Sequence, residues 1–304
     1  MWLSDLAKFL QYIGASALFG TSYFLIVFIR PHGTSITQML KWPKKLFAFA
    51  SLTLISGALF SIIASAAMMN DVPLNSLKFV QVIQIATETD QGEIACLRIV
   101  LGVAGLIWVL VSSSTKYFLK ILCSIGLALM ISLTFTGHGM KDEGTAGIIH
   151  LSADIAHVLA AGLWIGALFG FLFLLLSPPT SELQGVIHKA LSKFSGLGSF
   201  VVAMIVLSGL VNSYFLIGVS NVIQIFSSYY GILLVTKIGL FILMLILAAL
   251  NRFVLTTKFG DIIKHSNYSL NITNNISNSI ILETALGLIV LLLVSFLGSL
   301  DPFL

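Results

Sequence analysis

Long apolar segments alternate with short polar connections along almost the whole chain. Eight of these segments reach the roughly 20 residues that a helix needs to cross the hydrocarbon core of a bilayer. The pattern predicts an all-α polytopic membrane protein, because a helix satisfies its backbone hydrogen bonds internally. We expect a bundle of eight transmembrane helices in a single domain over residues 1–304, with spans at about 9–29, 46–69, 94–112, 117–137, 148–176, 195–217, 230–250 and 279–298.

The composition agrees with a membrane protein and excludes an ordinary soluble one. Hydrophobic residues make up 58% of the 304 residues, charged residues make up 9%, and the mean hydropathy is +1.04. The net charge of +4 does not indicate nucleic-acid binding, because the basic residues lie mainly in short connections between spans.

The distribution of basic residues predicts the orientation of the bundle. Connections that are rich in Lys and Arg generally lie on the cytoplasmic side. Most of the 16 basic residues follow spans 1, 3, 5 and 7, whereas most acidic residues lie on the opposite side. We therefore expect both termini on the outer side. The basic residues on the predicted inner side are Arg30, Lys41, Lys44, Lys45, Lys116, Lys120, Lys189, Lys193, Arg252, Lys258 and Lys264.

Ionisable residues enter an apolar span in the stretch from Thr136 to Gly166. His150, Asp154 and His157 are spaced i, i+4 and i+7, which places them within about 60° of arc on one helix face. Such residues are energetically costly inside a membrane and indicate a pathway or a binding site. A lone histidine can equally be a hydrogen-bonded packing residue, so a structural role is the alternative. The predicted orientation opens this face outward.

Three further charged residues lie inside spans and need partners there. Lys237 lies at about the same depth as Asp154, so an ion pair between them is expected. Glu283 lies within reach of Arg252, which suggests a structural pair. Arg98 is expected either to extend its guanidinium to the outer interface or to pair with an acid.

Several motifs resemble the copper resistance protein D family of bacterial inner-membrane proteins. The most specific is HLSADIAHVLAAGLWIGAL at 150–168, preceded by GHGM at 137–140. Three later blocks agree with it, and the family-like core extends over about 94–302, whereas residues 1–93 share only the layout of spans. The later blocks are FSGLGSFVVAMIVLSGLVN (194–212), YGILLVTKIGLFILMLILAALNRF (230–253) and LETALGLIVLLLVSFLGSLDP (282–302).

The resemblance implies a protein that is not an enzyme and that transports copper ions across the bacterial cytoplasmic membrane, in the direction of uptake. It also implies a periplasmic copper-binding protein as partner. Imidazole and thioether groups suit copper, and Asp154 could orient an imidazole or neutralise the ion. We therefore predict a copper site formed by His138, Met140, His150, Asp154 and His157.

Two other functions fit the same residues. The first is a haem-binding membrane oxidoreductase, with His138 on the fourth span and His150 or His157 on the fifth as axial ligands. The second is a scaffold that docks a periplasmic partner, in which the histidines only stabilise the bundle.

The charge distribution makes the predicted topology testable with reporter fusions. Fusions at Lys44 and Lys258 should report the cytoplasm, and fusions at Glu88 and Asp142 should report the periplasm, because basic connections are retained inside. A cytoplasmic signal at Asp142 would contradict the orientation and would place the histidine face on the wrong side for copper entry.

Overall fold

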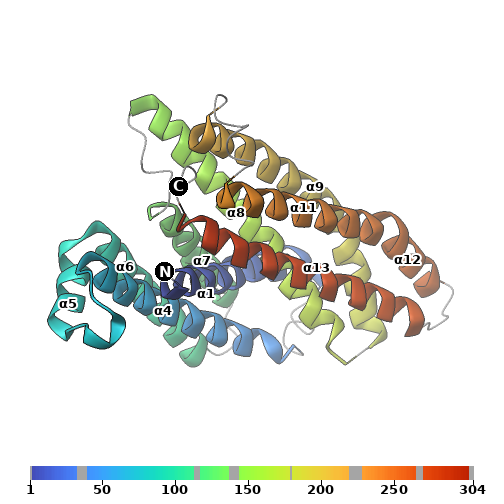
Figure 1. The fold of residues 1–304 in the computed structure, drawn as a ribbon. Helices are drawn as coiled ribbons and strands as arrows, with labels where there is room; N and C mark the ends of the chain where they lie inside the picture. Colours follow the sequence, from blue (N-terminus) through green and yellow to red (C-terminus); the bar gives the residue numbers. More distant parts are fainter. Residues whose placement is uncertain are drawn as a thin grey trace.

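The computed structural model describes residues 2–32, 40–112, 117–136, 144–178, 180–218, 228–264 and 270–300. Every regular element within these ranges is a helix (Figure 1). The α-helices are α1 (Trp2–Ser16), α2 (Ser22–Phe24), α4 (Trp42–Met69), α5 (Phe79–Glu88), α6 (Asp90–Val111), α7 (Phe118–Thr134), α8 (Gly144–Leu175), α9 (Ser181–Ile217), α11 (Tyr229–Leu250), α12 (Thr256–Lys264) and α13 (Leu270–Leu297). The shorter elements are the π-helical segments η1 (Ala17–Thr21), η2 (Leu25–Ile29) and η7 (Asn251–Leu255) and the 3-10 turns η3 (Arg30–His32) and η4 (Leu74–Ser76).

Among the described residues, 7 helical segments are long and apolar enough to cross a membrane. They are Trp2–Ile29, Trp42–Met69, Asp90–Val111, Gly144–Leu175, Glu182–Ile217, Tyr229–Asp261 and Asn274–Leu297. The remaining predicted span, 117–137, corresponds to α7, a shorter apolar helix of 17 residues. The predicted all-helical membrane architecture is therefore confirmed for the described residues. The first membrane helix begins at Trp2, earlier than the apolar pattern suggested.

The first membrane helix, from Trp2 to Ile29, lies in the middle of the bundle and is mostly covered by other helices (Figure 1). Its backbone touches that of α8 where the two cross. A Cβ atom on Gly20 would lie 2.1 Å from the carbonyl oxygen of Gly162, and one on Gly166 would lie 2.3 Å from the Cα of Gly20. The Thr21 hydroxyl donates to the Gly166 carbonyl at 2.8 Å. Residues without a side chain therefore set the position of α8.

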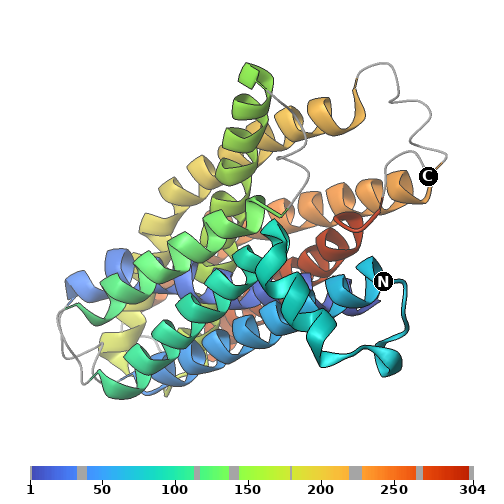
Figure 2. The ribbon, with the colours of Figure 1, turned by 90° about the vertical axis from the view of Figure 1, so that its left-hand side faces the viewer.

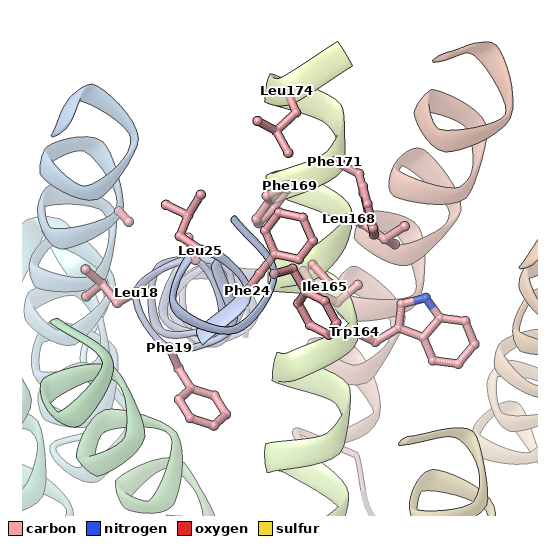
Figure 3. Close-up of a cluster of buried hydrophobic side chains, with 14 of the residues drawn as sticks. Leu18, Phe19, Phe24, Leu25, Trp164, Ile165, Leu168, Phe169, Phe171 and Leu174 are labelled. Carbon is pink, nitrogen blue, oxygen red and sulfur yellow. The ribbon is translucent and has the colours of Figure 1, made fainter. Parts of the chain in front are cut away.

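The same helix also contacts α4 and α7 through small residues. A Cβ on Gly14 would lie 2.6 Å from the Ala50 carbonyl oxygen of α4, and one on Gly126 of α7 would lie 2.4 Å from the Phe19 nitrogen. Aromatic side chains fill the space beside these crossings. Figure 3 views the first helix end-on, with Phe24 reaching toward Phe171 of α8. Their rings meet edge to face with centroids 4.6 Å apart.

Both ends of the described chain lie at the same end of the bundle, which we call the terminal end (Figures 1 and 2). The Lys8 ammonium donates to the Gly298 carbonyl and to the Ser299 hydroxyl, at 2.5 and 2.8 Å. At the other end, the Lys44 ammonium donates to the Ser112 carbonyl at 2.6 Å. The start of α1 is therefore joined directly to the residues that follow α13.

The contact between the first helix and α8 predicts that alanine substitution will affect stability very differently at two glycines. Gly20→Ala should destabilise the protein by about 1–3 kcal/mol, because its methyl group overlaps the α8 backbone. Gly239→Ala is the matched control, since nothing lies within 4 Å of a Cβ there. It should be neutral or stabilise by up to about 1 kcal/mol through helix propensity. Thermal unfolding of both variants in detergent measures the difference, and equal midpoints would contradict the close crossing.

Candidate functional site

A cavity of about 460 Å³ lies between the first helix, α8, α9, α11 and α13. Lys8, Leu297 and Gly298 line it near the terminal end, and Met244 and Gly287 line it deeper in the bundle. Its walls combine apolar side chains with an unusual number of polar and charged ones. The charged and polar lining includes Lys8, Gln11, Tyr12, Ser16, Arg98, Thr136, His150, Asp154, His157, Asn212, Ser213 and Lys237.

Helix α8 carries His150, Asp154 and His157 to this cavity, as their spacing predicted. His150 is 2% exposed, and its ring stacks on Phe215 of α9 with centroids 4.8 Å apart and planes 7° from parallel. This stacking fixes the plane of the imidazole. The two histidines are therefore part of one cavity wall and not isolated packing residues.

The hydrogen bonds of His157 determine which ring nitrogen is available to a ligand. Nδ1 lies 3.1 Å from the Ile205 carbonyl oxygen and 3.0 Å from the Ser208 hydroxyl oxygen. A carbonyl can only accept, so Nδ1 carries the proton and donates it. The Ser208 hydroxyl donates in turn to the Met204 carbonyl. Nε2 therefore keeps its lone pair, which is the usual arrangement of a metal-binding histidine.

Asp154 has a neutral hydrogen-bond partner. Its carboxylate accepts from the Asn212 side-chain amide at 3.3 Å, and it interacts electrostatically with His150 and Lys237. Within the described part of the chain, Asp154 makes no hydrogen-bonded ion pair with Lys237. The expected interaction between the two charges is thus present as an attraction across the cavity, and the direct contact is with α9.

Arg98 is 3% exposed and lies beside the cavity instead of extending to the interface. Its guanidinium donates to Gln11 Oε1 at 2.8 Å, to Ser132 Oγ at 3.0 Å and to Thr136 Oγ1 at 2.9 Å. It also donates to the Ser132 carbonyl oxygen. Arg98 is therefore buried and does not extend to the interface, and its hydrogen-bond partners among the described residues are uncharged. Hydroxyl, amide and carbonyl dipoles from α1, from α7 and from the turn after α7 take the place of an acidic partner.

Glu283 also differs from its expected pairing. It is 4% exposed and accepts from Trp164 Nε1 at 2.9 Å and from Asn251 Nδ2 at 3.0 Å. Arg252, the expected partner, donates instead to Ser199 Oγ at 2.6 Å. The short π-helical segment η7 explains this, because it turns Asn251 into the core and leaves Arg252 exposed.

The predicted ligand set is only partly described. His138 and Met140 lie outside the described residues, so their place relative to the cavity is untested. Among the described residues, no group of three or more His, Cys, Asp or Glu side chains could hold a metal ion. His150, Asp154 and His157 therefore share one cavity wall, without forming a metal site by themselves. Sequence reasoning missed Gln11, Tyr12 and Asn212, whose positions depend on helix packing.

Comparisons with known proteins agree on one family. A family model described as copper resistance protein D matches residues 188–297, and a model of the N-terminal domain of copper resistance protein D-like proteins matches residues 1–148. The chain is 32% identical to copper resistance protein D of Pseudomonas syringae pv. tomato, with 99% of this chain and 97% of the relative covered. The similarity thus includes residues 1–93, where the sequence motifs showed only a similar layout.

Two further relatives are less completely covered. The chain is 29% identical to the inner membrane protein YebZ of Escherichia coli (strain K12), with 72% of each chain covered. It is 32% identical to the copper transport protein CutJ of Bacillus subtilis (strain 168), with 43% of this chain and 23% of that protein covered. No solved structure matches the chain.

The electrostatic contact between Asp154 and Lys237 can be tested with a double-mutant cycle. Lys237→Met should lower the thermal stability, because an unpaired charge at this depth costs at least about 2.5 kcal/mol on insertion scales. Adding Asp154→Asn should restore part of that loss, since it removes the charge left without a partner. Strictly additive effects in detergent-solubilised protein would show that the two charges do not interact.

Proposed function

Because the chain belongs to the copper resistance protein D family, we propose that it binds copper ions in the cavity and carries them across the bacterial cytoplasmic membrane in the direction of uptake. The names of the relatives support copper handling and an inner-membrane location. They name resistance and transport proteins, which favours a transport role over an enzymatic one.

We further propose eight spans, with both termini in the periplasm, in a single membrane domain. The Lys8 contacts with Gly298 and Ser299 support an even number of crossings, because both ends of the chain then lie on one side. Helix α7 completes the set if it crosses the membrane together with its flanking residues; its 17 residues alone extend about 26 Å. In this orientation the cavity faces the periplasm.

The availability of His157 Nε2 on the same cavity wall as His150 is the observation that carries the proposal. Imidazole nitrogen is a good copper ligand, and the Nδ1 hydrogen bond to a carbonyl holds the ring in the correct tautomer. His138 and Met140, in the connection before α8, complete the proposed ligand set. Asp154 acts as the nearby negative charge that compensates the ion.

The positive side chains around the site keep copper binding reversible. Lys237 and Arg98 line the same cavity and repel a cation, whereas Asp154 attracts it. A transport site must bind strongly enough to load and weakly enough to release. The balance of charges therefore suits a carrier better than a storage site, and we propose that a periplasmic copper-binding protein delivers the ion.

The haem and scaffold functions receive no comparable support. Haem would need two imidazoles on facing helices, and the predicted pair includes His138, which lies outside the described residues. The names of the relatives mention copper and not haem. A scaffold would not require the free lone pair of His157.

The copper site is tested by metal analysis of purified variants. His150→Ala and His157→Ala should each weaken copper binding by at least about 10-fold, because each removes a ligand. Ser208→Ala should weaken it less, since it removes only a second hydrogen-bond acceptor of the His157 ring. His188→Ala is the control: this residue packs against Phe259 and does not line the cavity, so binding should be unchanged.

Copper-dependent uptake into cells provides the second measurement and should fall with binding in the same variants. Equal copper stoichiometry in the wild type and in a His150→Ala/His157→Ala double variant would remove the site from α8. Copper binding that persists without uptake would favour the scaffold function instead.

A further inference from the structure

Glu283 occupies a second polar site deeper in the bundle than the histidines. Trp164 and Asn251 donate one hydrogen bond to each of its two carboxylate oxygens, at 2.9 and 3.0 Å. Helices and η7 pack around it, and only 4% of the residue is exposed. Figure 3 shows Trp164 on the side of α8 that faces away from Leu18 and Leu25 of the first helix.

The charged groups on the elements packed against α13 lie far from Glu283 or point elsewhere. His157 and Asp154 lie about 10 and 15 Å outward of Trp164 along α8, and Lys237 lies about 21 Å from Asn251 along α11. Arg252 binds Ser199, and Lys258 and Asp261 of α12 are exposed. Asp5 and Lys8 of α1 lie at the terminal end, His150 lies further outward on α8, and Lys264 is the last residue of α12.

An ionised Glu283 would therefore have neutral partners only, among the described residues. Removing a carboxylate from water costs several kcal/mol, and two neutral N–H donors recover only part of that. A bound cation would remove the remaining cost. The surroundings thus favour binding of a cation to the Glu283 carboxylate during part of the proposed transport cycle.

Asn251 provides an oxygen atom that could interact with such a cation. Its Oδ1 is buried and has no hydrogen-bond partner in the structure, although buried polar atoms are normally paired. Rotating the amide by half a turn would present Oδ1, in place of Nδ2, to Glu283 Oε2. One orientation donates to the ionised carboxylate, and the other accepts from a protonated carboxyl.

The site offers too few oxygen atoms for a metal ion. Hard cations take six or more oxygen ligands, whereas here both carboxylate oxygens already accept N–H donors and a single amide oxygen remains. A proton needs only one oxygen to bind and one to receive its hydrogen bond. We propose that Glu283, with Asn251 and Trp164, forms a proton-binding site whose occupancy is linked to the copper cavity.

Trp164 provides that link, because it lines the cavity and also donates to Glu283. A change in the cavity that moves the indole removes a donor from the ionised carboxylate and so favours protonation. The proton binds at Oε2 from water and returns to water when the indole donor is restored. The link to copper rests on the proposed function, whereas the proton site itself does not.

Infrared difference spectra of the full-length protein in lipid nanodiscs, between alkaline and acidic buffer, test the proton site. The wild type should show the C=O stretch of a buried protonated carboxyl group. Glu283→Gln should lose this band, and Glu182→Gln, which removes an exposed glutamate, should keep it. Glu283→Asp should shift the band, which provides a readout if the glutamine variant fails to fold. Identical spectra in the wild type and Glu283→Asp would overturn the proposal.

Addition of Cu(I) to the same samples tests the link. Copper should change the amplitude of the Glu283 band in the wild type but not in Trp164→Phe, which lacks the indole donor. If bound copper leaves the amplitude of the Glu283 band unchanged in the wild type, the link is overturned. Absence of copper binding by metal analysis, with the acid–base band intact, would instead contradict the proposed function and leave the proton site standing.

Discussion

The backbone contact between the first membrane helix and α8 is the constraint on which the rest of the structure depends. Gly20, Gly162 and Gly166 allow the two helices to touch without side chains between them, and Thr21 fixes the contact with a hydrogen bond. In a membrane, where apolar side chains gain little from leaving lipid, such close packing is a main source of helix association. It holds α8 at the centre, so that the histidine face has helices on several sides and encloses a cavity.

Among the described residues, the hydrogen-bond partners of the buried charges Arg98, Glu283 and Asp154 are neutral dipoles and not opposite charges. Arg98 is held by hydroxyl, amide and carbonyl oxygens, Glu283 by an indole and an amide, and Asp154 by Asn212. We expected Glu283 to pair with Arg252 and Arg98 to pair with an acid. Both expectations assumed that charges at a similar depth in the membrane form ion pairs. Desolvating two charges can cost more than their attraction returns, whereas dipoles fixed by helices are already in place.

The apolar pattern was enough to predict the helices, and helical spacing was enough to place His150, Asp154 and His157 on one cavity wall. Both depend on short-range periodicity, which the sequence displays directly. The partners Gln11, Tyr12 and Asn212 come from other helices, and their rotation about the helix axis is set by packing of small residues. The π-helical segment at Asn251 also has no sequence pattern of its own, yet it decides whether Asn251 or Arg252 faces Glu283. His138 and Met140 remain predictions.

The arrangement along α8 also bears on how transport would proceed. The histidines line the cavity, Trp164 lies two turns deeper than His157, and buried Phe169, Phe171 and Leu174 fill the part of α8 beyond it. A channel would need a polar path past this region, whereas the described residues there are closely packed. For the proposed transport, copper would therefore pass only after a change in the packing around Trp164. Such a change would also alter the hydrogen bond to Glu283, so the proposed copper movement and the proposed proton site would depend on each other.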